Sequence, residues 1–173
     1  MAITTLQLKI MARRWRDILK NSTRIRDFCV EKYGRRPTIF VGVNGRKLPD
    51  KRHGPAIFIL PGVKTEGLIP EFAHAIAVSW FIVQEKISVD GVEQPWRENV
   101  TGELIEFLGA YEADDLGQII YEVLAEELMD DYPITKAEYD IDTSPEYFPQ
   151  WPGHMVLTTE IDPCMGEIIY YEE

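Results

Sequence analysis

The chain has 173 residues, of which 45% are hydrophobic and 27% are charged. A chain of this length and balance can bury a core, so collagen-like, low-complexity and fully disordered proteins are excluded. The longest apolar run, residues 75–83, contains Ser79 and is about half as long as a membrane-spanning helix requires, so we expect no membrane span.

Two further features bear on the cellular compartment. Residues 1–20 contain no apolar stretch that is preceded by charge and followed by a small-residue cleavage site, so we expect no secretory signal. Cys29 and Cys164 lie 135 positions apart, a spacing typical of neither a disulfide-stapled mini-domain nor a zinc site. We therefore expect two buried or idle thiols in a reducing cytoplasm.

The net charge is −11, but the two signs are segregated along the chain. Residues 1–53 hold 14 Lys or Arg against 4 Asp or Glu, whereas residues 54–173 hold 4 against 25. This segregation predicts complementary faces that meet within the fold, between copies of the chain or on a different partner. Internal contact or self-association is the favoured interpretation, and nucleic-acid contact by the basic third is the alternative.

The first predicted element is helical and spans about residues 5–33. Apolar side chains recur there at helical spacing, and basic side chains fill the polar face. Residues 21–23 either cap a second helix or lie on the outside of one long helix. Gly34 suits a helix C-cap, and the Arg-Arg-Pro sequence at 35–37 ends the helical stretch.

The hydrophobic period then changes to two, which predicts strands. In order, we expect a strand over 38–43, a tight turn at Asn44-Gly45, a polar loop over 46–55 and a strand over 56–60. Pro61-Gly62 is expected to stop the second strand, with residues 61–71 as an exposed connection.

The longest predicted strand spans residues 72–89. Its even positions are mostly large and apolar, while its odd positions are small at first and large later. This pattern suits a long antiparallel strand with one core face and one face covered by a helix. Asp90-Gly91 is a turn signal, and residues 92–99 are expected to form a polar loop.

The clearer second helix spans about residues 115–130. Asp115 suits the N-cap, Gln118 stands at the capping-box spacing, and the carboxylates of Asp114 and Asp115 would be stabilised at a helix N-terminus. An apolar stripe follows at Leu116, Ile119, Ile120, Val123, Leu124 and Leu128. Residues 100–113 are equally compatible with strand and helix.

Strand periodicity returns at residues 134–142, 155–162 and 166–171, with an aromatic and proline-rich loop between the first two. The whole pattern predicts an α+β fold with a mainly antiparallel sheet, flanked by an N-terminal helix and a second amphipathic helix. We expect a single domain over residues 1–173, with 1–10 as a candidate flexible arm and 166–173 as a candidate C-terminal extension.

The sequence contains no pattern of known catalytic chemistry. It has no phosphate loop, no G-x-G-x-x-G and no G-x-S-x-G. Its histidines, His53, His74 and His154, are far apart, and His74 is expected at the surface or at a sheet edge. We therefore expect no enzyme, no cofactor and no metal.

Four carboxylates offer the one arrangement with metal-binding chemistry. They are Asp140, Asp142, Glu160 and Asp162, which alternate within two predicted strands. Adjacent strands would bring them together for a cation such as Mg²⁺ or Ca²⁺. Alternation in a half-exposed sheet is the favoured explanation.

The candidate interface residues are six cations in two groups, Arg35 and Arg36, then Arg46, Lys47, Lys51 and Arg52. Nucleic-acid readers usually interleave stacking aromatic residues with such cations, and this loop has none. Docking on an acidic neighbour therefore explains the loop at least as well. The loop around Tyr147, Phe148 and Trp151 is either a ligand groove or packing over an open sheet end.

The order of the predicted elements resembles the tail terminator (tail-completion) proteins of tailed bacteriophages. The shared layout is an N-terminal helix, the strand 38–43 with its long loop, the strand 56–60 ending at Pro61, the long strand 73–89 and a second helix. The sequence Tyr147-Phe148-Pro149-Gln150-Trp151-Pro152-Gly153 also leads into strand 155–162 as an aromatic-proline loop does there. The resemblance covers about residues 10–165 and rests on layout, because the family has no short diagnostic motif.

The resemblance implies a virion protein of the tail and neck, assembled in the host cytoplasm. Six copies would form a ring that caps the tail tube, stops its polymerisation and presents the surface on which the head docks. Its partners would be itself, the tail tube protein, the head–tail connector protein and, in contractile tails, the sheath. Genomic DNA would pass through the lumen without sequence-specific binding, and no catalytic residue is involved.

Two other classes stay open from the sequence. One is a different head–tail connector or neck protein of similar size and ring symmetry. The other is a small enzyme or nucleic-acid-binding regulator that uses the basic third, which predicts DNA affinity that falls steeply with salt.

Overall fold

The computed structural model describes residues 8–42, 49–65, 72–130 and 132–161. The helices are α1 (Leu8–Asn21), α2 (Thr23–Tyr33) and α3 (Leu108–Leu128), with short 3₁₀ turns η1 (Lys51–His53) and η2 (Pro145–Tyr147). The strands are β1 (Thr38–Val41), β2 (Ala56–Thr65), β3 (Phe72–Val83), β4 (Lys86–Val89), β5 (Val92–Pro95), β6 (Ile105–Phe107), β7 (Ile134–Ile141) and β8 (Gln150–Ile161).

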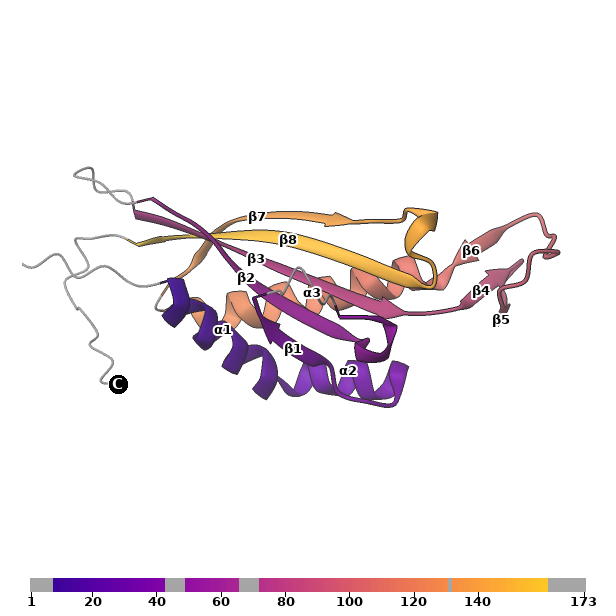
Figure 1. The fold of residues 1–173 in the computed structure, drawn as a ribbon, viewed down its shortest axis with the longest axis horizontal. Coiled ribbons are helices and arrows are strands. Elements are labelled where there is room, and N and C mark those ends of the chain that lie inside the picture. Colours follow the sequence, from indigo (N-terminus) through magenta and orange to yellow (C-terminus); the bar gives the residue numbers. More distant parts are fainter. Residues whose placement is uncertain (1–7, 43–48, 66–71, 131, 162–173) are drawn as a thin grey trace, which may run out of the picture.

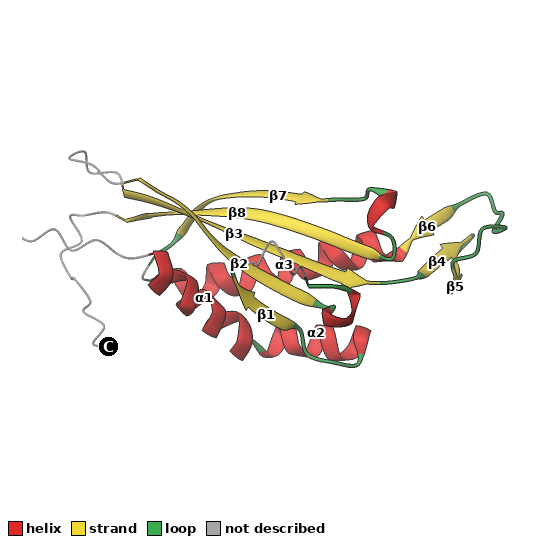
Figure 2. Ribbon diagram, in the orientation of Figure 1, coloured by secondary structure: helices red, strands yellow, loops and turns green. Residues whose placement is uncertain are grey.

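The main sheet has five strands in the order β1-β2-β3-β8-β7. Only the β1–β2 pair is parallel, and the other three pairs are antiparallel. A smaller sheet, β5-β4-β6, projects beyond one end of the main sheet (Figure 1). The helices run beneath the main sheet (Figure 2). The structure thus confirms the predicted α+β fold with a mainly antiparallel sheet.

The core lies between one sheet face and the helices. The even positions of β3, from Ile76 to Ile82, are buried in one cluster with Trp15 of α1 and Leu116 of α3. The predicted core face of this strand is therefore correct. The expected helix over the odd positions is wrong, because Phe81 on that face instead stacks on Phe58 of β2.

Trp80 is the centre of this core and is 1% exposed. Its indole N–H donates to the Ala113 carbonyl at 2.8 Å. The indole lies between Gly153 of β8 and Gly117 of α3, where an added Cβ would come within 2.3 Å of its ring atoms at either position. The two glycines therefore provide the space that this large side chain occupies.

The N-terminal helical stretch divides into two helices. The Ser22 hydroxyl accepts a hydrogen bond from the Ile25 backbone N–H at 3.3 Å and caps α2. Gly34 ends α2 in the left-handed conformation at φ 69°. The structure thus selects the capping alternative at residues 21–23 and confirms the predicted C-cap.

Strand β2 continues through the predicted stop at Pro61-Gly62. The β2–β3 register shifts between Pro61 and Lys64, which marks a bulge or irregularity where the missing proline N–H is tolerated. Gly62 allows the close approach of β3, because a Cβ there would lie 2.7 Å from the Ala75 carbonyl oxygen. The prediction of a strand ending at residue 60 is wrong for this reason.

The predicted strand over residues 72–89 is two strands in different sheets. The chain leaves the main sheet at Gln84, whose backbone N–H donates to the Pro149 carbonyl and whose side-chain oxygen accepts from the Lys86 N–H. The turn at Asp90-Gly91 is confirmed, with φ 51° and 84° in the left-handed region. Residues 92–95 form β5 instead of the expected loop.

Helix α3 begins at Leu108, and residues 105–107 form β6. Asp114 and Asp115 are therefore inside the helix, and the predicted N-cap at Asp115 is wrong. The apolar stripe continues upstream through Gly109 and Ala113, but the buried Glu112 interrupts it in the sequence. The buried stripe from Leu116 to Leu128 is as predicted.

The aromatic loop is also shorter than expected, because β8 begins at Gln150 and includes Trp151 and Pro152. The Trp151 indole N–H donates to the Gln84 carbonyl at 3.0 Å. Phe148 and Trp151 thus pack over the end of the sheet, which is the second of the two alternatives for this loop. The turn at residues 44–45 and the strand at 166–171 lie outside the described residues.

Candidate interaction surfaces

Four of the six candidate interface residues lie together at one corner, which we call the basic corner. Arg35 and Arg36 follow α2, while Lys51 and Arg52 belong to η1, and all four are exposed. The Arg35 guanidinium donates to the Arg52 backbone carbonyl at 2.9 Å and joins the two segments. Arg46 and Lys47 lie outside the described residues.

Asp50 neutralises part of the basic corner. Its carboxylate accepts hydrogen bonds from the Arg52 backbone N–H at 2.9 Å and from the Arg52 side chain at 2.8 Å. The hydrogen bond from the Arg52 guanidinium lowers the pKa of the Asp50 carboxyl to about 2. The sequence does not reveal this pairing, since 3₁₀ turns have weak signals. Lys51, Arg35 and Arg36 therefore carry most of the available charge there.

The three histidines are separate, as their spacing indicates. His53 accepts the Asp50 N–H at 3.2 Å and completes the cap of η1. His154 is exposed and shares a hydrogen bond of 2.8 Å with the Ser79 hydroxyl. His74 is only 2% exposed, so its predicted surface position is wrong; it occupies an even, helix-facing position of β3.

Asp140 and Glu160 belong to opposite ends of the β7–β8 pair. Strands β7 and β8 are neighbours, but Asp140 lies opposite His154, whereas Glu160 follows Thr159, which lies opposite Ile134 at the other end of β7. Asp162 is outside the described residues. Within the described ranges, no group of three or more metal-binding side chains is present.

A buried carboxylate joins α3 to α2 and to the junction of the two sheets. Glu112 is 9% exposed and accepts hydrogen bonds from the Tyr33 hydroxyl at 3.0 Å and from the Gln84 amide at 3.0 and 3.1 Å. The Lys32 ammonium is 3.9 Å from it. This cluster is not among the predicted sites, and its one signal in the sequence is an acidic residue at an apolar-stripe position.

We expect stability to fall at alkaline pH through Tyr33. Burial, followed by the nearby Glu112 charge, raises the pKa of Tyr33 well above its ordinary value. In the unfolded chain the phenol ionises near pH 10. The contribution of Tyr33 to the free energy of unfolding is therefore complete below about pH 10. It is lost as the pH rises towards the folded-state pKa, because the unfolded state then binds fewer protons than the folded state.

Urea titrations between pH 8 and 11 test this expectation. Tyr33→Phe is expected to flatten the alkaline slope, which for one tyrosine is at most about 1.4 kcal/mol per pH unit. Burial also raises the pKa of Tyr139, so the double Phe variant should flatten the slope further. An unchanged slope in Tyr33→Phe would contradict the assignment.

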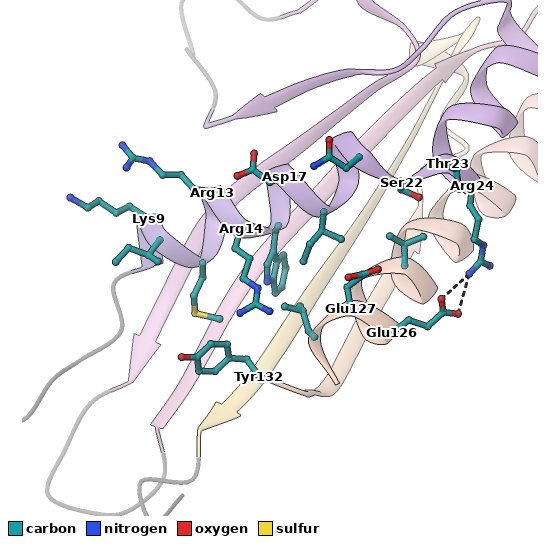
Figure 3. Close-up of a pocket in the computed structure, with 17 residues that line it drawn as sticks. Lys9, Arg13, Arg14, Asp17, Ser22, Thr23, Arg24, Glu126, Glu127 and Tyr132 are labelled. Carbon is teal, nitrogen blue, oxygen red and sulfur yellow. Dashed lines mark hydrogen bonds and ion pairs between the residues drawn. The ribbon is translucent and has the colours of Figure 1, made fainter. Parts of the chain in front are cut away.

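A groove of about 900 Å³ lies between α1 and the C-terminal half of α3, and we call it the α1–α3 groove (Figure 3). Its α1 side carries Lys9, Arg13 and Arg14 beside apolar Ile10 and Met11. Figure 3 shows Lys9 and Arg13 extending outward at the rim, while Arg14 points towards Tyr132. The groove therefore combines positive charge with apolar surface.

The acidic residues of the groove are largely paired. Arg24 forms ion pairs with Glu122 and with Glu126, the latter at 3.0 Å. Asp17 pairs with Arg16 at 2.8 Å. Among the described residues, neither Lys9 nor Arg13 forms an ion pair. Glu127 also lines the groove without an ion pair among the described residues. The unpaired positive charge of the groove lies on the N-terminal half of α1, across from Glu127 on α3.

The smaller sheet and its connections, residues 86–107, form what we call the arm. Four of its large apolar side chains face solvent: Val92 (66% exposed), Leu104 (55%), Trp96 (37%) and Ile105 (37%). Residues 92–99 were expected to be a polar loop, so the sequence did not indicate this apolar surface. Exposed apolar groups that gather on one projection are typical of an interaction site.

No protein-family model matches the chain, and no curated protein matches its sequence. No helix within the described ranges is both long and apolar enough to cross a membrane.

Proposed function

We propose that this chain is a structural subunit that joins copies of itself into a ring, and that the ring caps a phage tail tube as tail terminator proteins do. The observation that carries this proposal is the unlike character of the two ends of the molecule. The arm projects from one end with exposed apolar side chains, and basic α1 begins towards the other (Figure 1). Cyclic rings need two different patches on each subunit.

The basic corner is the proposed contact with the tail tube protein or with a neighbouring subunit. Arg35, Arg36 and Lys51 present charge from a corner that the Arg35–Arg52 hydrogen bond holds in place. A fixed group of like charges steers an acidic partner and sets its register. The head–tail connector protein and, in a contractile tail, the sheath complete the proposed set of partners.

The sheet face that points away from the helices is the proposed lining of the lumen. On β7 it carries Lys136, Glu138 and Asp140, of which Lys136 and Glu138 form an ion pair at 3.0 Å. An acidic lining would repel the DNA backbone and let the genome pass without being bound. No catalytic step belongs to this role.

Absolute mass by light scattering at low and high salt tests self-association. We expect a mass near six protomers at low salt that decreases as salt screens the charged contacts. The same protein should also be tested for binding to tubes assembled from the tail tube protein of the same genome, because a subunit that is monomeric in solution can still form its ring on a tail tip. A salt-independent monomer that does not bind tubes would overturn the proposal.

The basic corner is tested by the double variant Arg35→Glu, Lys51→Glu. It is expected to lose ring or tube attachment while keeping the wild-type circular dichroism spectrum. Lys20→Glu, Arg26→Glu is the matched control, since it makes the same charge change at solvent-accessible positions outside the basic corner, the α1–α3 groove and the proposed lumen face. Equal attachment of both double variants would show that the corner is only a solvated surface.

A further inference from the structure

The arm is held rigidly on the body of the molecule. Trp96 and Phe107 of the arm pack against Phe148 and Trp151 of the main body, with ring centroids 5.3 to 6.4 Å apart across this cluster. The Trp96 backbone N–H also donates to the Glu85 carbonyl at 2.9 Å. The arm therefore presents its apolar side chains in a fixed direction.

The outer end of the arm is ordered by its own hydrogen bonds. The Asp90 carboxylate accepts from the backbone N–H groups of Glu103 and Leu104 at 3.1 and 2.9 Å, and the Asp90 N–H donates to the Leu104 carbonyl. This arrangement fixes Leu104 and Ile105, which are exposed, near the turn that precedes Val92. A rigid apolar surface loses little entropy on binding.

The charges of the arm and of the α1–α3 groove are opposite. Residues 86–107 hold five Asp or Glu against two Lys or Arg. The groove is lined by four basic residues, Lys9, Arg13, Arg14 and Arg24, against three acidic ones, Asp17, Glu126 and Glu127. Each surface also carries exposed or half-buried apolar side chains, such as Leu104 on the arm and Ile10 in the groove. The two surfaces therefore complement each other in both respects.

The arm cannot reach the groove of its own chain. Helix α3 starts directly after the arm at Leu108 and ends at Leu128, which lines the groove. A helix of 21 residues separates its two ends by about 30 Å. A contact between arm and groove must therefore join two copies.

We propose that the arm of one copy docks in the α1–α3 groove of the next copy, with acidic residues of the arm against Lys9 and Arg13. This proposal rests on the self-association proposed above and names its contact surfaces. It is a head-to-tail contact, in which each copy uses its arm at one neighbour and its groove at the other.

Two charge-reversal variants test the contact. The arm variant is Glu98→Lys, Glu103→Lys, whose side chains form no ion pair among the described residues. The groove variant is Lys9→Glu, Arg13→Glu. Each variant alone places like charges across the contact, so its association constant is expected to fall by about 100-fold or more. The control Lys20→Glu, Arg26→Glu should keep the wild-type mass.

An equimolar mixture of the two variants gives the decisive measurement. The basic arm of the arm variant fits the acidic groove of the groove variant. The native acidic arm of the groove variant fits the native basic groove of the arm variant. Copies can therefore alternate around a ring with an even number of subunits, and light scattering should recover the wild-type mass only in the mixture.

Any other result contradicts the arm–groove contact. A mixture that stays dissociated, while the wild type is oligomeric, overturns the contact and leaves the proposed ring intact. Loss of mass in the groove variant alone would assign the groove to another occupant, such as the chain's own acidic residues 162–173. If the wild type is monomeric at every concentration, the contact is overturned. The proposed function is then tested only by the binding of the protein to tail tubes.

Discussion

Replacing Trp80 by alanine is expected to lower the free energy of unfolding by about 3–5 kcal/mol, a large share of the stability of a domain of this size. Trp80 is 1% exposed, and its indole N–H donates to the Ala113 carbonyl at 2.8 Å. The variant removes this hydrogen bond and leaves a cavity between β8 and α3. Urea unfolding followed by far-ultraviolet circular dichroism measures the loss without relying on tryptophan fluorescence.

Gly153 offers a double-mutant test of the same site. In the wild type, Gly153→Ala would place its Cβ 2.3 Å from the Trp80 ring, so we expect a loss of about 1–3 kcal/mol from overpacking. In the Trp80→Ala background the same change should be neutral or stabilising, because it fills part of the cavity. Additive effects of the two substitutions would contradict the proposed packing.

The sequence predicts those elements whose stabilising contacts are local or periodic. Ser22 and Gly34 delimit α2 because they act on neighbouring backbone groups, and the stripe from Leu116 to Leu128 has the helical period. The turn at Asp90-Gly91 is predictable because its conformation depends on those two residues. In each case the decisive interaction lies within a few positions of the signal.

The errors arise where distant residues decide the structure. Gln84 ends β3 by bonding to the Pro149 carbonyl and to Glu112, and neither partner is near it in sequence. Pro61 is accommodated only because the β2–β3 register shifts at that point. The start of α3 was missed because Glu112 places a carboxylate in an apolar stripe, which the buried hydrogen bonds explain only after folding.

The candidate surfaces are also formed by residues that are distant in sequence, so the sequence does not predict them fully. The composition indicates a basic first third, but the meeting of Arg35 with Arg52 and the pairing of Arg52 with Asp50 depend on the path of the loop. The α1–α3 groove exists because α1 packs beside a helix about 100 positions later in the chain. The exposed apolar side chains of the arm are not predicted, because most of the residues around them in the sequence are polar.

Replacing Glu112 by alanine is the second change with a large expected effect, a loss of about 2–4 kcal/mol. The variant leaves the Tyr33 hydroxyl and the Gln84 amide without the carboxylate that accepts their hydrogen bonds. Glu112→Gln keeps one acceptor oxygen and should lose less. Glu126→Ala is the control on the same helix, because its ion pair with Arg24 is exposed and such surface pairs add little to stability.

The effect of Glu112→Ala on the arm distinguishes a joint between the sheets from an ordinary core contact. Gln84 connects β3 to β4, so loss of its partner should speed amide hydrogen exchange in residues 86–89 more than in residues 56–60 of β2. Equal acceleration in both segments would assign Glu112 to general stability alone. Selective acceleration would mean that this carboxylate sets the direction of the arm. The proposed self-association should then weaken in Glu112→Ala, although the arm keeps every acidic residue and apolar side chain.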